Sequence, residues 1–232
     1  MTGVQTCALP ISWISIKTVF IATIITFFVG IIAAYWMTNY EGKFRNIIDT
    51  VFTLPLVLPP TVVGFFLLII FGKNGPIGKL LMKFGTSLIF SWPAAVVAAA
   101  VVSFPLMYRT TKGSFEQIDN NIINAARTLG VSECKIFWKV ILPLAWPGIG
   151  AATVLSFARC LGEFGATLMV AGNIPGKTQT IPIAIYFAAE NGEMGNALIW
   201  VILIVAISTV MIFLMDYWNE RQKKNIYGVG RR

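Results

Sequence analysis

The chain has 232 residues, of which 56% are hydrophobic and 12% are charged, and its formal net charge is +8. A soluble domain usually carries about 25% charged residues, so this composition excludes an ordinary soluble protein and indicates a membrane protein. Nucleic-acid binding is disfavoured because the basic residues lie beside the ends of apolar runs rather than on one polar face. The chain contains no histidine and three widely spaced cysteines, which excludes histidine-based catalysis and disfavours a protein-held metal or a disulfide framework.

The first residues do not look like part of the fold. The string MTGVQTCALPI lacks the basic start and the continuous apolar core of a signal peptide, and it resembles a translated sequencing adapter. We therefore expect residues 1–12 to be a non-native N-terminal segment.

Five apolar runs approach the length of about 20 residues that a helix needs to cross a bilayer. We predict an all-α polytopic membrane domain over residues 13–218, with spans at 13–37, 51–71, 86–108, 144–170 and 197–216. The second span contains Pro55, Pro59 and Pro60, which predict a kinked or broken helix. Residues 180–189 are apolar but too short to span, so we expect a re-entrant or interfacial piece there.

Basic residues predict the orientation of these spans. Three segments that fall on one side of a five-span protein carry most of them: 41–49, 109–143 and the tail 219–232. The opposite loops hold Lys73, Lys79, Lys83 and Lys177. The excess of positive charge on cytoplasmic loops places the N-terminus outside and the basic tail in the cytoplasm.

The longest mixed polar stretch between apolar runs is 119–143, which lies on the predicted cytoplasmic side. Its first part predicts a short helix with Ile122, Ala125, Ala126 and Leu129 on one apolar face. Gly130 is expected to end that helix. A second helix is expected to start at Ser132 as the N-cap, and Pro143 is expected to stop it. Its predicted apolar face is formed by Ile136, Phe137, Val140 and Ile141.

Two charges, Arg159 and Glu163, fall inside the predicted fourth span one helical turn apart. Charge inside a membrane is costly and is usually paired or turned toward a water-filled interior. Two interpretations are open: the residues lie along a transport pathway, or they pair with each other and only lock the helix.

No enzyme site is visible in the sequence. The stretch GKNGPIGKL at 72–80 has the wrong glycine spacing for a phosphate loop, and Leu80 stands where Ser or Thr would hold Mg²⁺. A turn between spans explains it better.

The 119–143 stretch resembles the EAA loop of ABC importer permeases. Ala125 and Ala126, then Gly130, then Val140, Leu142 and Pro143 match the spacing of that signature, while Asn124 stands where the family usually has Glu. The resemblance implies that these seven residues contact a separate cytoplasmic ATPase. It also implies that ATP and Mg²⁺ are used by that partner, with no cofactor or metal bound by this chain.

Further stretches narrow the resemblance to the permease subunits of molybdate ABC importers: TLPLVLPPTVVGFFLL at 53–68, FSWPAAVVAAAVVSFPLM at 90–107, SFARCLGEFGAT at 156–167 and NIPGKTQTIPIAIY at 173–186. This implies a homodimeric, non-enzymatic permease in the bacterial inner membrane, working with an extracytoplasmic molybdate-binding protein. Tungstate or sulfate remains an alternative substrate. A stand-alone secondary transporter is a further alternative, which the missing internal repeat disfavours.

Overall fold

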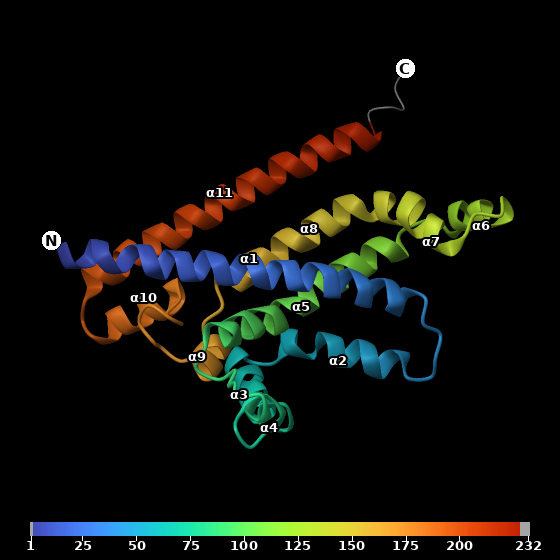
Figure 1. The fold of residues 1–232 in the computed structure, drawn as a ribbon. Helices are drawn as coiled ribbons and strands as arrows, with labels where there is room; N and C mark the ends of the chain where they lie inside the picture. Colours follow the sequence, from blue (N-terminus) through green and yellow to red (C-terminus); the bar gives the residue numbers. More distant parts are fainter. Residues whose placement is uncertain (1, 228–232) are drawn as a thin grey trace.

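The computed structural model describes residues 2–227, and the regular elements in that range are helices (Figure 1). The four longest are α1 (Thr2–Thr38), α5 (Trp92–Glu116), α8 (Leu142–Leu161) and α11 (Met194–Tyr227). The described chain holds four helices that are long and apolar enough to cross a membrane, or five spans if one bent pair of helices is counted as a single span. The predicted all-α polytopic fold is therefore confirmed.

Helices α1, α5 and α8 pack against one another and form the core of the bundle. Small residues allow the close approach of α5 to its neighbours. The alanines of α5 that are buried are Ala94, Ala95, Ala98, Ala99 and Ala100. Toward one end of the bundle the small residues give way to larger ones, and Met107 and Tyr108 fill the space between the helices without exposure to solvent.

The predicted second span is two helices, α2 (Arg45–Val57) and α3 (Pro60–Phe71), which meet at a bend of 117°. Leu58 is extended, as expected for a residue before proline, and Pro60 is the first residue of α3. Pro59 and Pro60 thus lie at the break. Pro55, predicted to take part in it, lies instead inside α2.

A second break interrupts the predicted fourth span, so the expected single helix over 144–170 is wrong. Helix α8 ends at Leu161, and a separate short helix, α9 (Gly165–Ala171), follows. Gly64 of α3 faces α9 so closely that a Cβ atom there would come within 2.8 Å of the Ala166 Cα. The two breaks are therefore packed together, which local periodicity cannot predict.

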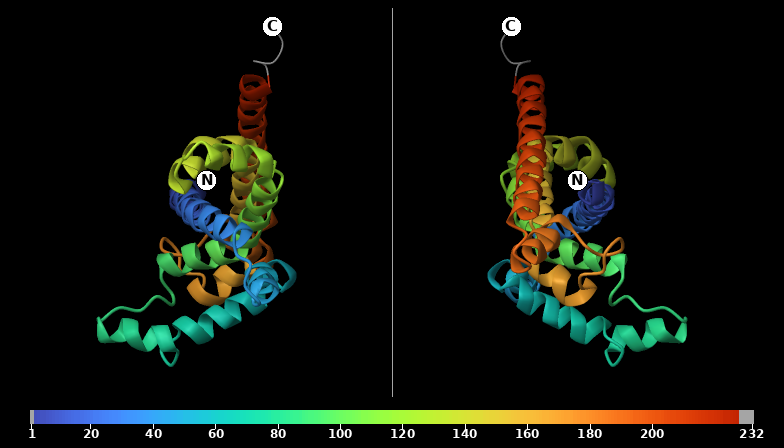
Figure 2. Two further views of the ribbon diagram at one scale, coloured as in Figure 1. Left: turned by 90° about the vertical axis from the view of Figure 1, so that its right-hand side faces the viewer. Right: turned by 90° about the vertical axis from the view of Figure 1, so that its left-hand side faces the viewer.

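The third span is also displaced from its prediction, since α5 begins at Trp92 rather than at residue 86 and continues to Glu116. The residues before it form turns that follow α4 (Pro76–Lys83). Helices α3 and α4 extend together away from the bundle as an arm (Figure 2).

The remaining short apolar run forms α10 (Ile181–Glu190), a helix of ten residues that is too short to span, as predicted. It packs against α11 and the first part of α1, where Ile11 joins a buried cluster with Ile181, Ala184 and Trp200. The predicted tail is helical up to Tyr227, and its last five residues, 228–232, lie outside the described residues, as does Met1 of the predicted non-native segment.

The α1–α2 connection and the short helices α6 (Asn120–Thr128) and α7 (Glu133–Ile136) lie toward one end of the molecule, and the C-terminal half of α11 extends toward the same end, apart from them (Figure 1). These elements overlap the three segments that carry most of the basic residues, 41–49, 109–143 and 219–232. Helix α10 and the N-terminus lie at the opposite end.

Candidate functional site

The candidate site is a helical platform, which we define as residues 119–143. Asp119 caps its first helix, α6, by accepting a hydrogen bond from the Asn121 backbone N–H at 2.9 Å. The face of α6 that packs on the core carries Ile123 and Ala126. Of the four residues predicted to share an apolar face, Ala126 packs on the core, whereas Ile122, Ala125 and Leu129 are exposed.

These three exposed residues recur at i, i+3 and i+7, so they form a second apolar strip on the free side of α6. Leu129, at the end of the strip, is 81% exposed. A helix with one strip on the core and another in solvent is suited to contact a second protein.

Gly130 ends α6 as predicted, with a φ of +72° that a glycine adopts without strain. The Val131 N–H donates to the Ala126 carbonyl at 3.3 Å, and the Gly130 N–H donates to the Arg127 carbonyl at 2.9 Å. This pair of bonds is a Schellman motif, which turns the chain sharply into α7.

Pro143 does not stop the second helix, contrary to prediction. A π-helical turn, η1 (Phe137–Ile141), joins α7 to α8, and Pro143 lies in the first turn of α8. The wide turn lets the Leu142 N–H donate to the Phe137 carbonyl, which accommodates the proline within a continuous helix. Glu133 to Leu161 is thus one helical path of 29 residues.

The predicted face of this second part is confirmed, since Ile136 and Ile141 are buried and Phe137 and Val140 pack beside them. Of the other signature positions, Leu142 packs against the same cluster and Pro143 is exposed. Ser132 occupies the N-cap position but makes no side-chain capping bond.

A polar group that the sequence analysis missed joins the two platform helices. Arg127 Nε lies 2.7 Å from Glu133 Oε1, and its Nη2 lies 3.2 Å from Oε2. The third guanidinium nitrogen donates to Asn124 Oδ1 at 3.3 Å. The hydrogen bond between Arg127 and Glu133 raises the pKa of Arg127 and lowers the pKa of Glu133, so both partners are charged near neutral pH.

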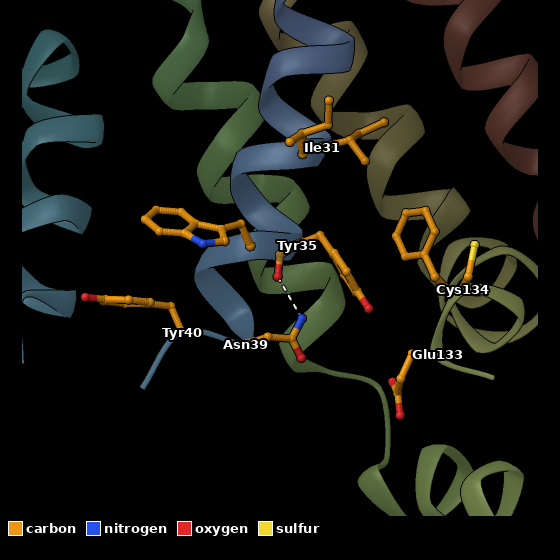
Figure 3. A pocket seen from close by; sticks show the side chains of 9 residues that line it. Ile31, Tyr35, Asn39, Tyr40, Glu133 and Cys134 are labelled. Atoms are coloured by element: carbon orange, nitrogen blue, oxygen red, sulfur yellow. Dashed lines mark hydrogen bonds between the residues drawn. The ribbon is translucent and has the colours of Figure 1, made fainter. Parts of the chain in front are cut away.

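Two hollows flank the platform. The larger, about 700 Å³, opens between the end of α1 and α7 (Figure 3). It is lined by Ile31, Ile32, Tyr35, Trp36, Asn39, Tyr40, Glu133, Cys134 and Phe137. The smaller, about 410 Å³, reaches α5 and α6, and Tyr35, Asn39 and Glu133 line both.

Arg159 and Glu163 are brought together, but not within one helix. Arg159 is in the last turn of α8, whereas Glu163 lies in the break before α9. Arg159 Nη1 is 2.9 Å from Glu163 Oε2, and Glu163 Oε1 accepts a hydrogen bond from the Ala166 N–H at 2.8 Å. The carboxylate is buried and the Arg159 side chain is 28% exposed, so the pair links the end of α8 to the start of α9.

A charged cluster that the sequence analysis also missed connects α2 to α5. Lys112 Nζ donates to Asp49 Oδ1 at 2.9 Å, and the Tyr108 hydroxyl donates to the same oxygen. Arg45 lies 3.7 Å from Glu116 beside them. The i, i+4 spacing of Lys112 and Glu116 was visible in the sequence, but their partners on α2 were not.

Comparison with known proteins gives one family. The sequence pattern of the family described as "Binding-protein-dependent transport system inner membrane component" matches residues 9–224.

Three relatives illustrate the match. YvgM of Bacillus subtilis (strain 168), named provisionally as a molybdenum transport permease, is 47% identical over 204 residues, or 88% of this chain and 90% of its own. The molybdenum transport system permease protein ModB of Escherichia coli (strain K12) is 43% identical over 212 residues, or 90% and 91% of the two chains. The sulfate transport system permease protein CysT of the same organism is 32% identical over 215 residues, or 93% and 78%.

Solved structures of low sequence identity share the fold. An inward-facing MetNI methionine ABC transporter chain superposes with a TM-score of 0.75 at 17% identity, covering 96% of this chain and 99% of that one. A chain of a bacterial alginate ABC transporter, in complex with an alginate-bound periplasmic protein, gives 0.78 at 14% identity and covers 94% and 80%.

Proposed function

The chain belongs to the family of binding-protein-dependent transport system inner membrane components, and from this premise we propose that it is the permease of an ATP-driven molybdate importer. The observation that supports a coupling role is the exposed apolar strip of α6, formed by Ile122, Ala125 and Leu129. The strip stands at one end of the molecule, on a platform that continues directly into a membrane-length helix.

The partner at this strip is a cytoplasmic ATPase. Ala125, exposed beside Leu129, leaves little side chain in the way of close contact, while Ala126 and Ile123 seat the helix on the core. ATP and Mg²⁺ are held by that partner, and this chain binds no cofactor. Closure of the ATPases moves the platform, and the platform moves the spans between inward- and outward-facing states.

The permease works as a pair of identical subunits in the bacterial inner membrane, with its N-terminus outside and its basic C-terminal tail in the cytoplasm. Basic residues support this orientation, because 12 of the 18 lie in the three sequence segments 41–49, 109–143 and 219–232. An extracytoplasmic molybdate-binding protein delivers the anion at the opposite end.

Molybdate is favoured over its chemical relatives by the comparisons. Identity to the two molybdenum transport relatives is 43% and 47%, against 32% to the sulfate permease of Escherichia coli. Uptake of radiolabelled molybdate by the complete transporter, with unlabelled tungstate and sulfate as competitors, tests this choice. Preferential competition by sulfate would assign the chain to sulfate instead.

Arg159 is the candidate for contact with the anion along the pathway. Its guanidinium is partly exposed while its partner Glu163 is buried, so a face of the cation remains available beside the helix break. An arginine in a membrane interior suits an oxyanion because it keeps its charge and donates in a planar fork.

Two platform variants test the coupling role. Gly130→Leu places a side chain on a residue with a φ of +72°, at a strain of about 1–2 kcal/mol, and Ala126→Arg forces a charge between α6 and the core. Both should abolish uptake while the permease still reaches the membrane. Gly192→Leu is the matched control, because Gly192 has a φ of +78° with open space around it and lies between α10 and α11.

Survival of both uptake and ATPase co-purification in the two platform variants would show that the platform is not the coupling element. A stand-alone secondary transporter would instead take up molybdate without any ATPase in the membrane.

A further inference from the structure

An ion pair joins the two platform helices, and the role that we infer for it rests on the proposed ATPase-coupled function. Arg127 lies in the last turn of α6, and Glu133 is the first residue of α7. Each charge is at the helix end whose dipole favours it. The ion pair therefore bridges α6 and α7 across the Gly130 turn.

Arg127 is hydrogen-bonded to Glu133 on α7 and to Asn124 on α6, and we call this set of contacts the clamp. Two nitrogens meet the two oxygens of Glu133 at 2.7 and 3.2 Å, and the third donates to Asn124 Oδ1 at 3.3 Å. A two-pronged contact of this kind restrains direction as well as distance. Asn124 thus fixes the guanidinium on α6, while Glu133 fixes it to α7.

Packing restrains α6 less than the long helices are restrained. Helix α6 has no fully buried residue, and Glu133 lines a hollow of about 700 Å³ on one side and another of about 410 Å³ on the other. Figure 3 shows Glu133 and Cys134 across the larger hollow from Tyr35 and Asn39. Because these hollows lie beside the join, packing does not fix the angle between α6 and α7. That angle is set by the Gly130 turn and by the Arg127 contacts.

The clamp contributes little to folding. The side chains of Arg127 and Glu133 are 49% and 60% exposed, and exposed ion pairs add little to stability. Its position gives it another use, because Glu133 begins the helical path that runs through η1 to Leu161. At about 1.5 Å per residue that path is ~43 Å long, and its far end carries Arg159.

We propose that Arg127 is a positioning residue for energy coupling: its clamp on Glu133 and Asn124 makes α6 move as one body with the helix that continues into α8. The ATPase displaces α6 through its contact with the exposed strip, and the clamp transmits this displacement to the helix that continues into α8. Without the clamp the Gly130 turn flexes and part of the motion is lost.

The test uses the complete transporter in proteoliposomes, with molybdate uptake and ATP hydrolysis measured on the same preparation. Arg127→Glu and Glu133→Arg should each lower uptake per ATP hydrolysed by about tenfold, a normal size for coupling between sites. The double variant restores the pair in reverse and should recover the ratio to within about twofold. Arg127→Lys keeps the charge but loses the planar two-pronged contact. Its uptake per ATP hydrolysed should lie between that of the unaltered chain and that of Arg127→Glu.

The control is Lys43→Glu, which reverses an exposed charge in the α1–α2 connection and should leave the ratio unchanged. Unchanged ratios in both single variants would overturn the inference. Loss in both singles that the double does not restore would also overturn it, because Arg127 would then act by touching the ATPase itself. Failure of the unaltered chain to co-purify with an ATPase would refute the proposed function, and the inference with it.

Discussion

The ion pair at the α8–α9 break should respond unequally to removal of its two partners. Arg159→Gln leaves the Glu163 carboxylate buried, with one hydrogen bond from Ala166 and no positive charge at Oε2. Removing one partner of a buried pair costs about 3–5 kcal/mol, and the 28% exposure of Arg159 favours the lower end of that range.

Glu163→Gln should lower the free energy of unfolding much less than Arg159→Gln does. The amide oxygen of Gln keeps the acceptor for the Ala166 N–H, and Arg159 can turn its charge toward water along its flexible stem. A loss of about 1 kcal/mol is expected for exchanging the ion pair for a neutral contact.

Thermal unfolding of the full chain in detergent micelles measures the difference. For a chain of this size about 1 kcal/mol shifts the midpoint by about 2–4 °C, so Arg159→Gln should lower it by ~6–12 °C and Glu163→Gln by ~2–4 °C. The double variant should resemble Glu163→Gln, because removing both charges leaves no buried unpaired carboxylate.

Equal losses in the two single variants, or a double variant that loses their sum, would refute this reasoning. Transport separates the two interpretations of the pair. Uptake per permease in the membrane should fall in Arg159→Gln more than the membrane level does if Arg159 contacts the anion. Parallel losses would mean that the pair only locks the break.

Two further predictions concern contacts between helices. Gly64→Ala should destabilise the chain by about 1–3 kcal/mol, because its Cβ would come within 2.8 Å of the Ala166 Cα. The control is Gly113→Ala, which has open space around it and should not lower the unfolding midpoint. A Gly64 variant as stable as this control would mean that α3 and α9 are not in close contact. Asp49→Ala removes the acceptor shared by Lys112 and Tyr108 and should loosen the contact between α2 and α5. Single cysteines placed on the two helices should then cross-link several-fold more slowly. An unchanged cross-linking rate would show that the aromatic contacts alone hold α2 against α5.

Several features were determined by local sequence. The class of protein follows from the apolar runs, because a run of membrane length has to form a helix to satisfy its backbone in lipid. The end of α6 follows from Gly130, since a positive φ is open to glycine without strain. Pro59 and Pro60 predict the first break for an equally local reason, namely that proline removes a helix donor and makes the preceding residue extended.

Other features were decided by tertiary structure. Periodicity showed that α6 has an apolar face, but Ile122 and Ile123 are neighbours in the sequence, and the position of the core selected Ile123. The proline at 143 stays within a helix because η1 widens the preceding turn, which a propensity cannot anticipate. In the same way, Glu163 keeps its i, i+4 partner although the helix ends between them.

The functional contacts divide along the same line. The spacing of Ala125, Ala126 and Gly130 marks the platform from sequence alone, because the small residues of a helix and the glycine that ends it are local properties. The clamp from Arg127 to Glu133 depends on how sharply the chain turns at Gly130, and the link from Asp49 to Lys112 depends on two helices meeting. Such contacts arise from the packing of separate segments, and only the folded structure brings those segments together.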